Sequence, residues 1–315
     1  MKKLLYTTGL FAITVLFITS CNDEQLKEWY FEEPPLPANA TVFGNESYNV
    51  GIDENSSFFV KLKGEPPFDF TYSDGEQEIT ITDIDTSVYE IPVMPDYTTY
   101  YKAVAVSNVM GEGSIETDSA VVNVFSVKNI FQSNFNSYVQ RSENGKGRDH
   151  SSDELLLLKN ASDEYARTSF YSFDLSSFVD DIASEDEFFF TFSILYSNNT
   201  TQNSIIVEAS DVSIDNTIDW GSQPLDELFE KVGQSEHKSF GTDKDASTLI
   251  ENQTFDLTSY VQSLIADGKS SFTLRLTLKD QNAAYLRIGS NNNSNESFRP
   301  KLEIKGQVYK PEINE

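Results

Sequence analysis

Short runs in which apolar and polar residues alternate recur from Thr41 to Phe125, with turn-forming residues between them. In the run YYKAVAV, for example, Tyr101 and Ala103 are expected on one face of a strand and Lys102 and Val104 on the other. A period of two residues is that of a β-strand whose two faces meet different surroundings. Several such runs in so short a segment predict an antiparallel β-sandwich.

Between residues 138 and 307 the predicted strands are longer and more aromatic, as in DEFFFTFSILYS and SSFTLRLTLKD. One short helix is expected at SLIADGK, with Thr258 or Ser259 as its N-cap and Gly268 at its end. This half of the chain is predicted to be a larger β-sandwich of the jelly-roll type, so the whole chain is expected to be all-β.

The chain begins with MKKLLYTTGLFAITVLFITSC, in which two lysines precede an apolar run and small residues precede Cys21. This order is typical of an export signal, and the run is too short for a confident membrane span. With Ile18-Thr19-Ser20 before the cysteine, it resembles the signal of a bacterial lipoprotein, which implies cleavage and lipidation at Cys21. The alternatives are an ordinary signal peptide or an anchor helix. Cys21 is the only cysteine, so no intrachain disulfide forms.

The acidic residues of Asn22-Asp23-Glu24-Gln25 resemble the export tails of surface lipoproteins in Bacteroidetes-type bacteria. The resemblance implies a lipid anchor in the outer membrane at the cell surface, with the periplasmic leaflet as the alternative. The following segment ends in EEPPLPAN, and its prolines favour extended backbone over helix. It is therefore predicted to be a spacer.

Two stretches of the first sandwich, LKGEPPFDFTYSDG (62–75) and PDYTTYYKAVAVSNVMGEG (95–113), resemble PKD-like or immunoglobulin-like modules of Bacteroidetes surface proteins. Five motifs follow one another in the second half of the chain: YARTSFYSFDLSSF (165–178), the aromatic strand with Tyr196, IDNTIDWGSQP (214–224), TFDLTSYVQSLIADGKSSFTLRLTL (254–278) and AYLRIGSNNNSNESFRPKLEIKG (284–306). Their succession resembles that of DNRLRE domains, which include carbohydrate-binding module family 96. One departure is that Ser290 is followed by NNNSNESF, where that family has Ser-Arg-Glu before Arg-Pro.

These patterns and resemblances predict six parts. They are a lipoprotein signal peptide (1–20), an acidic, proline-containing linker (21–38), an Ig-like or PKD-like domain (39–127), a junction (128–137), a DNRLRE-like carbohydrate-binding β-sandwich (138–307) and a C-terminal tail (308–315).

The formal net charge of −27 argues against nucleic acid as a partner, because phosphate binding requires a basic surface. Two histidines, His150 and His237, and one cysteine are too few for a zinc site, and no Gly-x-Ser-x-Gly or nucleotide-binding motif is present. Two sandwiches leave no room for a catalytic domain, so the chain is not expected to be an enzyme. A lyase or hydrolase that uses two carboxylates stays a weaker alternative. No cofactor is predicted, and a structural calcium ion is the alternative.

Sugar binding calls for aromatic rings that stack on the apolar face of a pyranose and, for acidic sugars, for arginines that bind the carboxylate. Trp220 lies in a segment of loop-forming residues, and Tyr196 lies at the end of a predicted strand. Each is a candidate platform on which a sugar ring stacks, or else a structural side chain that closes the end of the sandwich. Arg167, Arg275 and Arg287 lie on predicted strands; they either line a binding face or are occupied by carboxylates of the domain.

The loop QRSENGKGRDHSS (140–152) concentrates basic residues in an acidic chain. It is a candidate site for an anionic glycan, or a solvated loop whose own acids cancel much of its charge. Its candidate ligand-binding residues are Arg141, Lys146, Arg148 and His150.

By these resemblances the chain looks like a surface glycan-binding lipoprotein of a polysaccharide-utilisation system. Its expected partners are a polysaccharide, an outer-membrane importer and glycan-degrading enzymes, and it meets the membrane only through its lipid. The family resemblance favours a uronic-acid polymer such as alginate, and a neutral β-glucan stays open. The alternative from another class is an adhesion or structural lipoprotein that binds protein partners.

Overall fold

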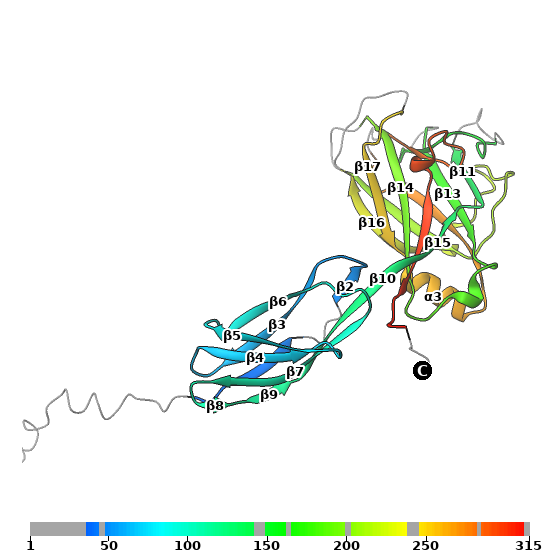
Figure 1. The fold of residues 1–315 in the computed structure, drawn as a ribbon. Helices are drawn as coiled ribbons and strands as arrows, with labels where there is room; N and C mark the ends of the chain where they lie inside the picture. The colour runs from blue at the N-terminus through cyan, green and yellow to red at the C-terminus, as the bar shows by residue number, and fades with distance from the viewer. Residues whose placement is uncertain are drawn as a thin grey trace, which may run out of the picture. The chain divides into compact units, whose positions relative to one another are not determined.

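The computed structural model describes residues 36–43, 48–141, 149–161, 165–198, 203–237, 246–281 and 285–311. The chain divides into two compact units, Met1–Val124 and Phe125–Glu315 (Figure 1). Strands are the predominant regular secondary structure in the described residues of both units, so the all-β prediction is confirmed. The predicted signal peptide, Cys21 and most of the predicted linker lie outside the described residues.

The first unit is a sandwich of two sheets, with strand orders β6-β3-β1-β9 and β10-β7-β4-β5. Alternation places Phe58, Val60 and Leu62 of β3 in the core, and Phe58 stacks on Tyr101 of β7 with ring centroids 5.0 Å apart. The strands are β1 (Asn39–Phe43), β2 (Tyr48–Gly51), β3 (Ser56–Lys63), β4 (Phe68–Ser73), β5 (Glu78–Ile84), β6 (Val88–Val93), β7 (Thr99–Asn108), β8 (Gly111–Glu112), β9 (Ser114–Thr117) and the start of β10 (Ser119–Gln132).

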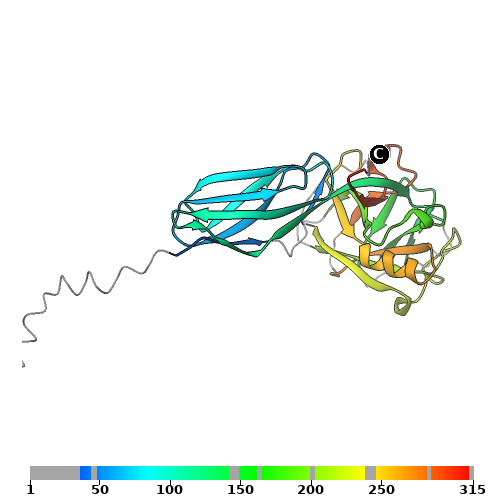
Figure 2. The same ribbon diagram turned by 60° about the horizontal axis from the view of Figure 1, so that its bottom comes forward.

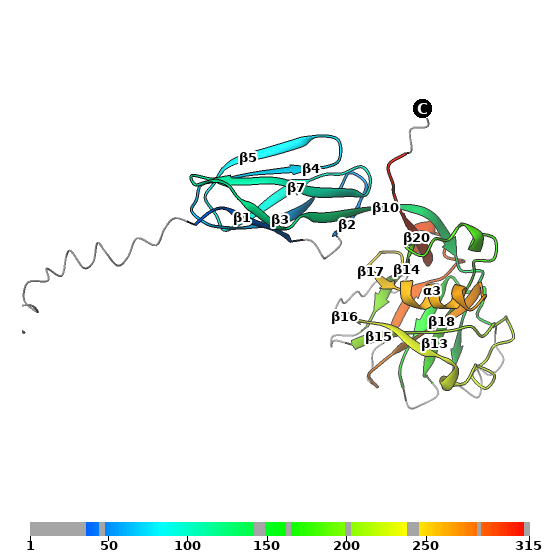
Figure 3. The same ribbon diagram turned by 90° about the horizontal axis from the view of Figure 1, so that it is seen from below.

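The second unit packs a five-stranded sheet, β11-β13-β18-β15-β16, against a sheet ordered β12-β19-β14-β20-β10 in which β17 also pairs with β14 (Figures 1 and 3). Its elements are β11 (Phe135–Gln140), β12 (Leu155–Leu158), β13 (Arg167–Asp174), β14 (Glu187–Ser197), β15 (Asn203–Ser210), β16 (Glu230–His237), β17 (Glu251–Asp256), α3 (Thr258–Ala266), β18 (Ser271–Leu278), β19 (Leu286–Gly289), β20 (Lys301–Gln307) and three 3-10 turns, Val179–Asp181, Asp226–Leu228 and Glu296–Phe298.

Aromatic side chains from both sheets fill the core of the second unit. Phe188, Phe190 and Phe192 of β14 alternate into the core and are each 0% exposed. Phe173 of β13 meets Phe190 edge to face across the sandwich, with ring centroids 5.8 Å apart. Complete burial of such a side chain stabilises the fold by roughly 1.5–3 kcal/mol. A slip of one residue would turn these rings outward, so the pattern fixes the register.

The helix α3 closes one end of this sandwich (Figures 1 and 2). Val261 and Leu264 are buried against the core, and the chain leaves the helix through Gly268, whose φ is 75°. The predicted helix end at Gly268 is therefore confirmed. Within the described part of the chain no helix is both long enough and apolar enough to cross a membrane.

The predicted N-cap of this helix is wrong. The N-cap residue is Leu257, which provides no side-chain cap. The carboxylate of Asp256 instead accepts a hydrogen bond from the amide of Thr258 at 2.8 Å, and the Thr258 hydroxyl accepts one from the amide of Phe188 at 3.0 Å. The Thr258 hydroxyl therefore binds the backbone of β14, and the Asp256 carboxylate accepts a hydrogen bond from a free backbone amide at the start of the helix.

Residues 128–137, predicted as a junction, contribute mostly to strands. From Phe125 to Gln132 strand β10 pairs with β20, and β11 begins at Phe135 beside β13. Phe131 packs against the core of the second unit, which gives this segment a place in the sandwich.

Candidate functional site

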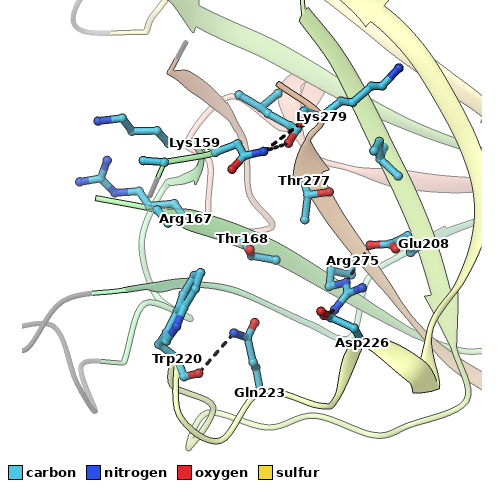
Figure 4. Close-up of a pocket in the computed structure, with 15 residues that line it drawn as sticks. Lys159, Arg167, Thr168, Glu208, Trp220, Gln223, Asp226, Arg275, Thr277 and Lys279 are labelled. Carbon is cyan, nitrogen blue, oxygen red and sulfur yellow. Dashed lines mark hydrogen bonds and ion pairs between the residues drawn. The ribbon is translucent and has the colours of Figure 1, made fainter. Parts of the chain in front are cut away.

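A cavity of about 500 Å³ lies on the outer face of the five-stranded sheet (Figure 4). Strand β18 starts at Ser271, shortly after α3, and ends at Leu278 beside the cavity. The cavity is therefore at the end of the sandwich opposite the helix.

Strand alternation builds the floor of the cavity. Leu274 and Leu276 of β18 point into the core, so Arg275 and Thr277 point outward into the cavity. Thr168 of β13 also lines this floor. The floor therefore offers two hydroxyl groups and a single buried arginine.

The loop between β15 and β16 forms one wall. The Asp219 carboxylate accepts hydrogen bonds from the amides of Gly221 and Ser222, both at 2.8 Å, and so fixes the turn that carries Trp220. A second turn is fixed by Asp215, whose carboxylate accepts bonds from the hydroxyl and the amide of Thr217. These two bonds lower the pKa of Asp215.

Trp220 packs against the sheet and also lines the cavity. Its ring packs against a small apolar cluster of Val139, Phe170 and Ile218 on the outer face of the sheet. The same residue lines the cavity, where Figure 4 shows its indole beside the floor strands. Gln223 donates a hydrogen bond to the Trp220 carbonyl at 3.3 Å and lines the cavity as well.

Arg275 is occupied by carboxylates of the domain. It is 6% exposed, and its guanidinium donates to Glu208 at 2.8 Å and to Asp226 at 2.5 Å. It also lies 4.3 Å from the centre of the Phe229 ring. Arg275 therefore closes the bottom of the cavity with its charge compensated.

Three further cations line the cavity without such compensation. Within the described ranges, Lys159, Arg167 and Lys279 form no ion pair with a carboxylate. Arg167 instead donates from Nε to the side-chain oxygen of Gln140 at 3.2 Å, and Lys159 lies 5.0 Å from the centre of the Tyr165 ring. The cavity thus holds more positive than negative charge in a chain of net charge −27.

Arg167 also connects the cavity to a set of stacked side chains. Its guanidinium lies 5.3 Å from the centre of the Tyr285 ring. Arg287 lies 5.7 Å from the same ring and 5.0 Å from that of Tyr196. The structure therefore brings together four of the residues predicted from the sequence: Trp220 and Arg167 at the cavity, and Arg287 and Tyr196 beside it.

The other predicted binding residues are placed differently. Arg141 is exposed, and its amide donates to the carbonyl of Ala166 at 2.9 Å. His150 is 3% exposed and stacks on Tyr138 with ring centroids 3.8 Å apart, so it offers little surface to a ligand. Lys146 and Arg148 lie outside the described residues.

The asparagine run after Ser290 holds neighbouring loops through its amides. Asn293 donates to the carbonyl of Glu154 at 3.2 Å, and Asn291 donates to the carbonyl of Ser133. Carbonyl oxygens of this kind are also the ligands that calcium takes. In the part of the chain that the structure describes, no three His, Cys, Asp or Glu side chains are grouped to hold a metal ion.

Sequence reasoning missed Lys159, Lys279, Tyr285 and Gln223. Both lysines stand directly after apolar strands, at the ends of ELLLLK and TLRLTLK. A cation at the end of a strand is placed with the loops rather than in the core, and this signal would have identified them.

Comparisons with known proteins give one family match. The model of carbohydrate-binding module family 96 matches residues 128–306. No curated protein matches the chain. Among solved structures, a latent aurone synthase (polyphenol oxidase) is 12% identical over 58% of this chain and 26% of its own, with a TM-score of 0.24. An I-band fragment of titin is 9% identical over 81% of this chain and 94% of its own, with a TM-score of 0.20. TM-scores this low do not show a shared fold. The chain spans about a quarter of the length of the aurone synthase.

Proposed function

The chain belongs to carbohydrate-binding module family 96, and from this premise we propose that its second unit binds an acidic polysaccharide, a uronic-acid polymer such as alginate, at the cavity beside Trp220. The family is one of binding modules, so the proposal includes no catalytic step.

The observation that carries the proposal is the charge of the cavity. Lys159, Arg167 and Lys279 gather there without carboxylate partners among the described residues, although acidic side chains outnumber basic ones by 50 to 23 in the chain. A cation that an acidic protein leaves uncompensated is available to a carboxylate of the ligand. A neutral glucan has no carboxylate that could form an ion pair with these cations.

The remaining lining residues suit a sugar ring. The hydroxyls of Thr168 and Thr277 and the amide of Gln223 can donate and accept hydrogen bonds, as sugar hydroxyls require. Trp220 presents an aromatic surface to the C–H face of a pyranose. The long-range repulsion between the acidic protein and a polyanion is screened beyond about 8 Å in physiological salt, so local contacts decide binding.

The proposal extends to the cellular setting. Cys21 would carry the lipid that anchors the chain to the outer membrane, with the cell surface favoured over the periplasmic leaflet. The first unit would serve as a spacer. The polysaccharide would be passed to an outer-membrane importer and to degrading enzymes of a polysaccharide-utilisation system.

Affinity gel electrophoresis of the purified protein tests the function. Gels contain alginate, pectin, laminarin, xylan or mannan, each with and without a chelator. Retardation by alginate or pectin, and not by the neutral polymers, is the expected result. A folded protein that migrates freely in every gel would refute polysaccharide binding, and retardation by laminarin alone would refute the acidic ligand.

A further inference from the structure

The outer face of the five-stranded sheet continues past the cavity onto the edge strand β16. Thr277 of β18 pairs with Ile206 of β15, and Ile206 pairs with Gln234 of β16. Thr277 and Ile206 line the cavity, and register partners on neighbouring strands share one face of a sheet. Gln234 therefore lies on the same face as the cavity, one strand beyond its lining.

A second row of register partners leads to Lys231 on the same edge strand. Arg275 pairs with Glu208, and Glu208 pairs with Lys231. Arg275 and Glu208 line the cavity and are bonded to each other at 2.8 Å. Lys231 is exposed, and within the described ranges it forms no ion pair with a carboxylate. It is thus an uncompensated cation, like Lys279, placed next to the cavity.

A β-bulge in β16 keeps Lys231 on the outer face. Val207 pairs with Gly233, and the next pair is Glu208 with Lys231, so Val232 is an extra residue on β16. Val232 packs against the core of the second unit. Without the extra residue, Val232 would pair with Glu208 and the alternation would turn Lys231 inward.

The inner side of β16 is packed closely on the core at this bulge. A Cβ atom on Gly233 would lie 2.5 Å from Cδ1 of Phe255, a core residue of β17. The space beneath the strand is therefore filled, and the exposed side chains of Lys231 and Gln234 lie on the outer face.

Lys231 and Gln234 contact each other on that face. The Lys231 ammonium donates a hydrogen bond to the side-chain oxygen of Gln234 at 2.5 Å. A lysine ammonium has three N–H donors, so this bond leaves two of them for a ligand. In the part of the chain that the structure describes, the side-chain nitrogen of Gln234 has no hydrogen-bond partner. The pair therefore offers a positive charge and a neutral donor side by side.

We propose that Lys231 and Gln234 form a second anion subsite, at the edge of the sheet, that binds a further carboxylate of the acidic polysaccharide chain lying in the cavity. The proposal rests on the proposed function and deepens it. Lys231 forms the ion pair with the carboxylate, and the amide of Gln234 donates a hydrogen bond to the same sugar residue.

The spacing of the strands determines which part of the polymer reaches this subsite. Neighbouring strands lie about 4.8 Å apart, so β16 is about 10 Å from β18. This distance exceeds the width of one sugar ring, so different residues of the polymer fill the cavity and the edge subsite. The polymer then runs across β18, β15 and β16, with the apolar side chain of Ile206 beneath it. A short oligomer fills the cavity alone.

Titration calorimetry with saturated alginate oligosaccharides of two to eight residues tests the proposal on the purified protein. The wild type is expected to bind the longer oligomers about tenfold more tightly than the dimer, which is the gain from roughly one added hydrogen bond between charged groups. Lys231→Met is expected to remove this gain and to leave the dimer affinity unchanged. Gln234→Leu should reduce the gain, also without a change for the dimer.

Lys61→Met is the matched control, because Lys61 is also an exposed lysine on a strand without an ion pair among the described residues, and it lies in the first unit. Its length dependence should equal that of the wild type. Equal losses at all oligomer lengths in Lys231→Met, no loss at any length, or a wild type that binds all lengths equally would overturn the second subsite and leave the proposed function standing. A wild type that binds no oligomer would overturn both.

Discussion

Arg275 on β18 lies beside Glu208 on β15, with the guanidinium Nε 2.8 Å from a carboxylate oxygen, at a position where the arginine is only 6% exposed. The two residues are register partners on neighbouring strands. Within the described ranges, Arg275 is the one cavity cation that has a carboxylate partner, and the pair assigns it a structural role.

Removing this arginine is therefore expected to reduce stability. In Arg275→Met, Glu208 keeps its charge in a largely buried position without its partner, and we expect a loss of about 3 kcal/mol in the free energy of unfolding. Asp226→Asn is the control, because that carboxylate is 95% exposed and its loss should cost about 1 kcal/mol or less. Urea denaturation measures both. Equal losses in the two variants would contradict the structural role of the Arg275–Glu208 pair.

A second buried ion pair ties β10 to the turn before β14. Lys128 Nζ lies 2.7 Å from the carboxylate of Asp186, whose side chain is 1% exposed. Lys128→Met is expected to destabilise the second unit by about 3–5 kcal/mol, because the buried charge of Asp186 keeps a hydrogen bond from the Ala183 amide but loses its cation. Adding Asp186→Asn removes the uncompensated charge, so the double variant should unfold at a higher urea concentration than Lys128→Met. A purely additive double variant would show that the two residues are not coupled.

The first unit should lose stability at high pH through Tyr101. Burial, together with the charge of Asp74, raises the pKa of Tyr101 to about 12, whereas an unfolded tyrosine has a pKa of about 10. Its contribution to stability is therefore complete below pH 10 and is lost as the pH rises from 10 to 12, by about 2–3 kcal/mol. Unfolding free energies of the wild type and Tyr101→Phe, measured from pH 9 to 12, should converge or cross above pH 10. A difference in unfolding free energy between the two proteins that stays constant from pH 9 to 12 would contradict the raised pKa of Tyr101.

Trp220 should report on ligand binding directly. The chain has two tryptophans, so Trp29→Phe leaves Trp220 as the only one. Since Trp220 lines the cavity, its emission is expected to change in intensity or wavelength as alginate oligosaccharides are added, and to saturate at the calorimetric affinity. Saturable binding by calorimetry without any change in emission would place the ligand elsewhere.

Much of the fold could be predicted from the alternation of apolar and polar residues along the chain, but much of the candidate site could not. The aromatic run of β14 predicts a buried strand, and its phenylalanines do face the core. The positions of Lys159 and Arg167 depend on an isolated β-bridge between these two residues, and that of Tyr196 depends on a β-bulge. The alternation of apolar and polar residues predicts neither feature. His150 looked exposed in a charged loop, but its stacking on Tyr138 is a tertiary contact that no local pattern shows.

The most direct test of the central claim is a titration of alginate oligosaccharides into the wild type, Lys279→Met and Lys102→Met. Lys279 is exposed at the cavity, and Lys102 is a similarly exposed lysine of the first unit, so the two variants change the net charge equally. Binding is predicted to weaken about tenfold or more in Lys279→Met, since a hydrogen bond to a charged group contributes about 1.5–3 kcal/mol, and to be unchanged in Lys102→Met. Equal affinities in all three proteins would contradict binding at the cavity.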